Sequence, residues 1–316
     1  VLLGELVDGY ERLREAADAA GHDGTCIAED AALVRRSPLG VQYVDYALWQ
    51  RSDALLPHLA SHRAYWRMAL HEGDLPVLEL PLDYPRPALQ TFNGDVVSVS
   101  IDASSVSRLE AAGRSVGCTL FQCVLGVWCV VLCRHAGQEE VVIGSPYHGR
   151  DVRGTESLIG YFVNVLALRV GMLSISSSSM GGGVLAGARD AASDAMRHAL
   201  VPFQSIVHDV LPRRSHDASR NAVFQAMIVW GAKAYGRSPP FHEVTSLLDS
   251  STAVPDSTSA LLCLIPVGVS ARVGPHRSAK VEVTLIGGMD GNNRIAGGIE
   301  FNTDLFARPA AKRLAS

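Results

Sequence analysis

Apolar residues repeat at helical spacing in the first seventy residues of this 316-residue chain. Leu3, Leu6, Tyr10 and Leu13 recur every three or four residues, which predicts an amphipathic helix. No Ser, Thr, Asp or Asn precedes it to bond its free N–H groups, so we expect the chain to begin inside a helix. Two more helices are expected over residues 41–51 and 54–72. The second has one largely apolar face, made of Leu55, Leu59, His62, Trp66 and Leu70.

From residue 97 onward, strand-like alternation is interleaved with helices. Val97, Val99 and Ile101 alternate with serines, which predicts a half-buried strand. Helices are expected over 104–116 and 119–135, followed by a short buried strand over 141–143. This succession predicts a mixed α/β fold class in which helices cover a sheet.

The C-terminal part of the chain carries similar signals at wider intervals. We expect a helix over 184–200, a buried strand over 223–230 and a final helix from residue 308. Alternating runs over 280–286 and 294–302 flank a turn rich in Gly, Asp and Asn, which predicts a β-hairpin.

Prolines mark the boundary that we expect between two lobes. Pro76, Pro81, Pro85 and Pro87 predict a stiff, extended connector. The Ser/Gly-rich run 174–183 is expected to be a surface loop. The aperiodic run 231–259 is expected to be a long loop that crosses between the lobes.

The amino-acid composition indicates which kinds of partner and which cellular compartment to expect. The net charge is −4 and no Lys/Arg cluster stands out, which argues against a nucleic-acid partner. The six cysteines form no CxxC pair, so we expect reduced thiols in the core, as in a cytoplasmic protein. The most apolar segment, 118–133, is too short to cross a bilayer, and no signal peptide opens the chain.

Familiar catalytic motifs are missing from the sequence. It contains no GxSxG elbow, P-loop, HExxH or dinucleotide-binding fingerprint, and its eleven histidines are scattered. From these patterns alone, the chain is a two-lobed α/β protein without an assigned activity.

Six stretches carry a family resemblance, and they follow one another along the chain in the order of the family's motifs. Four of them are YVDYALWQ (43–50), IGYFVNVLALR (159–169), HALVPFQ (198–204) and DASRNAVFQ (217–225). Two more are LPLDYPRP (80–87) and EFNTDLF (300–306). Together they resemble the ordered motifs of nonribosomal peptide synthetase condensation domains, in the chloramphenicol-acetyltransferase-like superfamily. HALVPFQ is a degraded match, because Ala199 and Leu200 replace the family's Gln-Asp.

The resemblance implies two chloramphenicol-acetyltransferase-like lobes that form a V with a tunnel between them. Residues 1–80 would be the C-terminal remainder of an incomplete N-lobe, and 81–316 the C-lobe with its latch and bridging segments. Donor and acceptor peptidyl carrier domains would deliver thioesters on phosphopantetheine arms, beside an adenylation domain of the same synthetase. The acceptor amine would attack the donor thioester and form an amide bond. No cofactor bound directly, no metal and no membrane partner is implied.

The family's catalytic motif, HHxxxDG, does not occur in this sequence. The resemblance places that motif just upstream of Val1, so we assign no catalytic residue within the chain. We expect this fragment to be inactive alone and poorly folded.

The resemblance also implies residues that support or line the tunnel, which are Ser145, His148, Arg150, Tyr161 and Asn164. Arg150 would form an ion pair with the Asp of the absent motif; the alternative is a solvated loop arginine. His148 either lines the tunnel or is incidentally exposed. Tyr161 and Asn164 belong to a segment expected to cross between lobes, where Asn164 would satisfy buried backbone groups.

Other residues of the motifs have simpler explanations. Tyr43, Tyr46 and Trp49 are interpreted as core aromatics of a helix, and His198 as structural. Residues 217–221 are expected to form a turn at the entry to the 223–230 strand.

Two other functions remain open from the sequence. One is a noncatalytic condensation-like domain that docks carrier proteins or a tailoring enzyme. The other is a stand-alone acyltransferase of the same fold.

Overall fold

The computed structural model describes residues 39–70, 75–172, 180–210, 217–231 and 278–316. These residues belong to two compact units. The smaller unit contains residues 39–55 and 150–162, and the larger unit contains the remaining described residues. The expected lobe boundary near residue 80 stays a prediction; the residues from 56 to 149 that the structure describes all belong to the larger unit.

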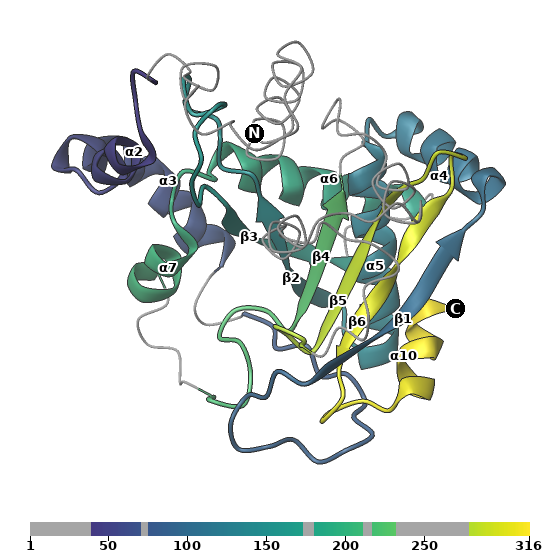
Figure 1. Cartoon of the computed structure of the whole chain (residues 1–316). Coiled ribbons are helices and arrows are strands. Elements are labelled where there is room, and N and C mark those ends of the chain that lie inside the picture. Colours follow the sequence, from purple (N-terminus) through teal and green to yellow (C-terminus); the bar gives the residue numbers. More distant parts are fainter. Residues whose placement is uncertain (1–38, 71–74, 173–179, 211–216, 232–277) are drawn as a thin grey trace, which may run out of the picture. The chain divides into compact units, whose positions relative to one another are not determined.

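A six-stranded mixed sheet forms the centre of the larger unit (Figure 1). Its strands are β1 (Gly94–Ile101), β2 (Glu140–Tyr147), β3 (Asn164–Gly171), β4 (Ala226–Gly231), β5 (Val283–Met289) and β6 (Ile295–Asn302). They lie in the order β1-β6-β5-β4-β2-β3. The pairs β2·β4 and β4·β5 are parallel, and the other three pairs are antiparallel. The mixed α/β class is therefore confirmed.

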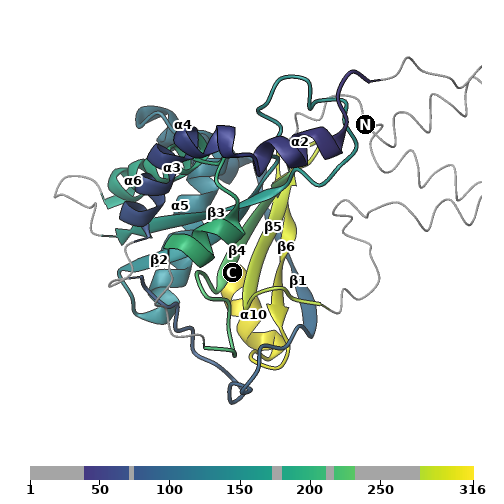
Figure 2. The same cartoon turned by 90° about the vertical axis from the view of Figure 1, so that its left-hand side faces the viewer.

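Helices cover this sheet. The helices of the larger unit are α3 (Leu56–Ala69), α4 (Ala103–Ser115), α5 (Leu120–Ala136), α6 (Met180–Arg197), α7 (Phe203–Ser205), η4 (Ile206–Val210) and α10 (Arg308–Ala315). Figure 2 shows α4, α5 and α6 together on one side of the sheet. There α5 packs against β2 and α6 packs against β3, while α10 packs against β1 and β6.

Helix α5 is the apolar core helix that the sequence predicts. Thr119 caps its first turn in a reciprocal pair of hydrogen bonds with Gln122, and Gly137 ends it at φ 66°. Cys123, Cys129 and Cys133 are buried along it. Burial raises the pKa of Cys123 to about 11, so this thiol stays protonated and packs as a small apolar group. The expected packing role is confirmed for these cysteines; Cys26 and Cys263 lie outside the described residues.

Among the described residues, no single helix has the length and apolar character to cross a membrane. Helices α4 and α5 together meet that test by length and composition, across a bend of 101°.

The smaller unit contains α2 (Tyr43–Gln50) and the short helix η2 (Asp53–Leu55). Tyr46 is buried there with Leu158 and Phe162, and Tyr43 packs against them. The expectation of a core aromatic is wrong for Trp49, whose ring is exposed. Its ring still lies 5.7 Å from that of Tyr46, so Trp49 packs at the solvent-exposed edge of the small cluster.

Several boundaries differ from those predicted. Strand β2 continues past the predicted 141–143 to Tyr147, because it pairs with β3, a strand that the sequence patterns did not indicate. Ser145 therefore lies within β2. Helix α6 begins at Met180, so residues 180–183 are helical and not loop. The predicted hairpin is confirmed as β5 and β6. The N-terminal helix, most of the Ser/Gly-rich run and nearly all of the 231–259 loop lie outside the described residues.

Candidate functional site

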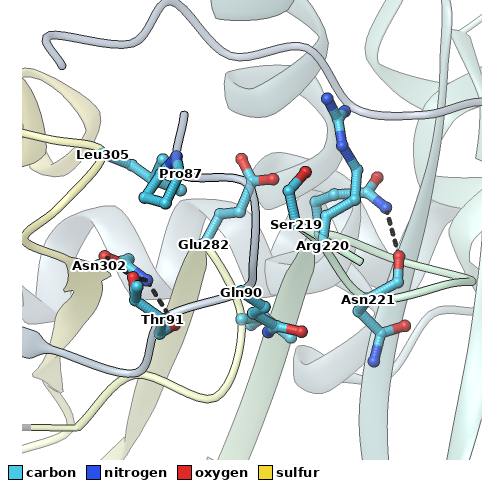
Figure 3. A pocket seen from close by; sticks show the side chains of 11 residues that line it. Pro87, Gln90, Thr91, Ser219, Arg220, Asn221, Glu282, Asn302 and Leu305 are labelled. Carbon is cyan, nitrogen blue, oxygen red and sulfur yellow. Dashed lines mark hydrogen bonds between the residues drawn. The ribbon is translucent and has the colours of Figure 1, made fainter. Parts of the chain in front are cut away.

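Three stretches that carry the family resemblance meet in the larger unit. Residues of 80–87, 217–225 and 300–306 line one small pocket, beside the ends of β5 and β6 (Figure 3). Its lining includes Pro87, Gln90, Arg220, Asn221, Glu282 and Asn302. Segments far apart in the sequence are thus brought to one place.

Hydrogen bonds to its backbone hold the extended connector, residues 75–93, at this junction. The Gln90 N–H donates to the carbonyl oxygen of Ala218 at 2.7 Å, and Asn302 Nδ2 donates to the carbonyl oxygen of Thr91 at 2.8 Å. The Leu78 N–H donates to Gln225 Oε1, also at 2.8 Å. Proline lacks a backbone N–H group, so a proline-rich segment cannot form a regular set of backbone hydrogen bonds. The side-chain amides of Gln225 and Asn302 bond to its backbone instead.

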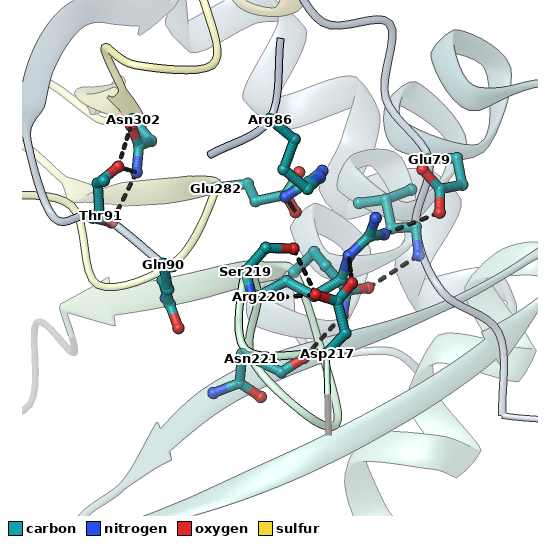
Figure 4. Close-up of polar contacts among 12 residues, drawn as sticks. Glu79, Arg86, Gln90, Thr91, Asp217, Ser219, Arg220, Asn221, Glu282 and Asn302 are labelled. Atoms are coloured by element: carbon teal, nitrogen blue, oxygen red, sulfur yellow. Dashed lines mark hydrogen bonds and ion pairs between the residues drawn. The ribbon is translucent and has the colours of Figure 1, made fainter. Parts of the chain in front are cut away.

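Two groups of ion pairs lie beside these bonds (Figure 4). Arg220 contacts Glu79 of the connector and Asp217, each at 2.8 Å. Arg86 contacts the buried carboxylate of Glu282 at 2.7 Å. Burial raises the pKa of the Glu282 carboxyl, while Arg86 acts in the opposite direction.

The 217–221 segment forms the predicted turn. Ser219 donates from both its N–H and its hydroxyl to Asp217 Oδ1, and these hydrogen bonds lower the pKa of Asp217. Asn221 Oδ1 accepts from the N–H groups of Val223 and Phe224, which leads the chain into β4. The Ser219 hydroxyl donates to the Asp217 carboxylate, and the described residues that line the pocket include no histidine.

In the smaller unit, Arg150 organises the 150–162 segment. Its Nη1 donates to the carbonyl oxygens of Thr155 at 2.5 Å and Leu158 at 2.9 Å. Its guanidinium also lies 4.3 Å from the centre of the Phe162 ring. The Tyr43 hydroxyl donates to the carbonyl oxygen of Tyr161 at 2.9 Å, while the Tyr161 side chain itself is exposed.

Three other predicted site residues lie near one end of the β2·β3 pair in the larger unit. Ser145 is buried opposite Leu166, and Asn164 is paired with Tyr147. The ring of His148, the next residue, lies 4.6 Å from the Tyr147 ring. Strand pairing therefore brings Ser145, His148 and Asn164 into one neighbourhood.

Asn164 satisfies backbone groups, as expected. Its Nδ2 donates to the carbonyl oxygens of Ala199 and Val201, both at 2.8 Å, and its Oδ1 accepts from the N–H groups of Val165 and Phe203. One amide thus ties the start of β3 to the segment that follows α6.

Replacing Asn164 by alanine is expected to lower the free energy of unfolding by about 1–3 kcal/mol, because it leaves partly buried backbone groups unpaired. Urea denaturation measures this loss. Asn164→Asp retains both acceptor bonds but places a carboxylate oxygen against the carbonyl oxygens of Ala199 and Val201, so it should be at least as destabilised as Asn164→Ala. Equal stability of all three proteins would contradict the anchoring role.

The comparisons with known proteins match this architecture. The model of the condensation domain family matches residues 34–316. The chain belongs to the condensation-domain family of nonribosomal peptide synthetases. This condensation domain is 40% identical over 205 residues to malpinin synthetase of Mortierella alpina, covering 65% of this chain and 2% of that protein. It is 34% identical over 282 residues to one of the plipastatin synthase proteins of Bacillus subtilis, covering 88% of this chain and 7% of that protein.

A solved structure shares the fold. The complex of the X-domain and OxyB from teicoplanin biosynthesis contains a chain that superposes with a TM-score of 0.66 at 23% identity, covering 89% of this chain and 57% of that chain. The condensation domain described here spans a tenth or less of the length of its curated relatives.

One constellation escaped the sequence analysis of this condensation domain. His62 of α3 and His198, which follows α6, have their Nδ1 atoms 3.1 Å apart. The two residues are 136 positions apart, so no local spacing could indicate the pair. The expected structural role of His198 fits its surroundings. Within the described residues, no group of three or more metal-ligating side chains is present.

Proposed function

We propose that the domain to which this chain belongs joins two carrier-bound aminoacyl or peptidyl thioesters by forming an amide bond. The observation that carries this proposal is the family match over residues 34–316, with the motifs in their family order. The convergence of three of those motifs on one junction supports the same function. The substrates would arrive on phosphopantetheine arms of donor and acceptor carrier domains.

In the proposed reaction, the acceptor's amine attacks the donor's thioester carbonyl. A C–N bond forms, the C–S bond breaks, and the donor's phosphopantetheine thiol leaves with a proton. Proton transfer to or from the amine would fall to the histidine motif of the family. The residues of this chain would act around that step and not in it. Arg150 and Asn164 would hold the segments that carry Tyr161 and His148, and Ser145 would support β2.

A reconstitution assay tests the proposal. The domain is produced with its upstream coding sequence and mixed with two carrier proteins, one loaded with a donor and one with an acceptor. Mass spectrometry of the acceptor carrier should then detect a dipeptidyl product. Alanine at the second histidine of an upstream HHxxxDG motif should abolish product, and undiminished product from that variant would overturn the histidine's role. We expect residues 1–316 alone to form no product.

A second candidate is a noncatalytic domain that docks carrier proteins or a tailoring enzyme. It is favoured by the degraded 198–204 stretch and by the shared fold with the X-domain, which was solved in complex with OxyB. In the same assay this candidate predicts binding of a carrier protein or a tailoring enzyme without any dipeptidyl product. Product formation would exclude it. In either case the partners would be neighbouring carrier and adenylation domains in the cytoplasm.

A further inference from the structure

A pair of half-buried histidines joins α3 to the residue that follows α6. His62 Nδ1 and His198 Nδ1 lie 3.1 Å apart, within hydrogen-bond distance. The His198 ring stacks on Tyr65, with ring centres 4.1 Å apart and planes 14° apart. Trp66 Nε1 donates to the carbonyl oxygen of His198 at 2.9 Å. Both the side chain and the backbone of His198 are therefore held by α3.

A contact between two Nδ1 atoms has room for one proton. One ring must donate its Nδ1–H and the other must accept with a bare Nδ1. The contact is satisfied when the pair is neutral or carries a single positive charge. When both rings are protonated, each Nδ1 carries a hydrogen, no acceptor remains, and two like charges face each other.

The surroundings do little to compensate a second charge. Asp194 and Arg197 of α6 are the charged neighbours of His198, and they form an ion pair with each other. On α3, burial raises the pKa of Tyr65 to about 12, so the phenol is neutral. Residues 199–203 carry no titratable side chain, and η4, which packs against α3, contributes His208. Burial, followed by the neighbouring His62, lowers the pKa of His198.

We propose that His62 and His198 form a proton-operated catch between α3 and the segment that follows α6. When the pair is neutral or carries one positive charge, the catch holds residues 198–203 on α3. A second positive charge releases it. Asn164 binds the same segment through Ala199 and Val201, so release of the catch also loosens the start of β3. This inference is independent of the proposed function.

The difference in bound protons between the folded and the unfolded chain sets the direction in which pH changes stability. Below a pH of about 6.5, the ordinary histidine pKa, both histidines of the unfolded chain take up protons. The folded pair accepts one fewer, so protons favour the unfolded chain. The catch therefore makes the unfolding equilibrium constant rise by up to tenfold for each pH unit below that value.

Urea denaturation of the full chain between pH 7.5 and 5.0 tests the catch. The variants are His62→Gln and His198→Gln, in which only one titrating ring remains at the contact. In the wild type, the pair should make the unfolding equilibrium constant rise by up to tenfold for each pH unit. Each variant should lose this contribution. The matched control is His58→Gln, an exposed histidine one turn before His62 on the same helix, which should retain the wild-type slope. Equal slopes for wild type and both pair variants would overturn the proposal.

A measurement on the unaltered protein covers the case in which a pair variant does not fold. Nitrogen NMR of the histidine rings should find one of the two with a protonated Nδ1 at pH 7.5 and its partner with a bare Nδ1. As the pH is lowered, the indole N–H of Trp66 should lose its protection from hydrogen exchange when the second ring is protonated. Independent protonation of both rings at the ordinary histidine pKa, with Trp66 still protected, would contradict the catch.

Discussion

Replacing Glu282 by alanine is expected to cost about 3–5 kcal/mol of the free energy of unfolding, because it leaves a buried arginine without its counter-charge. The side chains of Arg86 and Glu282 are 14% and 5% exposed, and they contact each other at 2.7 Å. The raised pKa of Glu282 indicates that desolvation outweighs the attraction of Arg86. The pair therefore adds little by itself, and most of the expected loss arises from the unpaired guanidinium. Urea denaturation monitored by circular dichroism measures it.

Two comparisons separate this explanation from a general loss of charge. Glu110→Gln removes an exposed carboxylate, 41% exposed and 3.9 Å from Arg114, and should cost less than about 1 kcal/mol. The double variant Arg86→Met/Glu282→Leu removes both buried charges and should recover most of the stability lost by Glu282→Ala. If Glu282→Ala costs no more than Glu110→Gln, the buried pair does not hold the connector to β5.

Replacing Trp66 by alanine should destabilise the larger unit by about 3–5 kcal/mol. The Trp66 side chain is completely buried on α3, and its indole N–H is bonded to the carbonyl oxygen of His198. Removing it opens a cavity and also frees the segment after α6. A shift of the urea midpoint to lower concentration, with an unchanged slope, is the expected observation.

Two changes on the same helix provide the controls for Trp66. Met68→Ala alters a side chain that is 74% exposed and should change stability by less than about 0.5 kcal/mol. Trp66→Phe keeps most of the ring volume and removes the N–H donor, so it should cost less than Trp66→Ala. A midpoint for Trp66→Ala equal to that of Met68→Ala would show that α3 is not anchored through this residue.

Much of the fold follows from local patterns. The helical spacing predicts that Leu59 and Trp66 lie on the buried face of α3, and both are buried. Alternation on both sides of a Gly/Asn-rich turn predicts the β5·β6 hairpin, since its register depends on nearby residues. The sequence patterns did not indicate strand β3, because residues 165–168 form a continuous apolar run without alternation. Its extent is set by pairing with β2.

Part of the candidate site could also be predicted from the sequence, and part could not. The six ordered stretches were enough to indicate the condensation-domain family, and the family match confirms it. The backbone-binding role of Asn164 was also anticipated. The exposure of Trp49 was not, because the spacing of Tyr43, Tyr46 and Trp49 does not show how many of the three rings the small cluster buries.

By itself, the sequence predicted the longer helices that the structure describes, including the apolar helix α5, and it predicted the hairpin and the family. Each depends on residues within a few turns of one another or on an ordered set of short motifs. Only the tertiary structure decided that Arg86 faces Glu282, that Arg220 joins Glu79 to Asp217, and that His62 meets His198. Most of these partners are far apart along the chain. A single charged side chain or histidine leaves no repeating pattern in the sequence. The packing of whole helices and strands decides which residue it contacts.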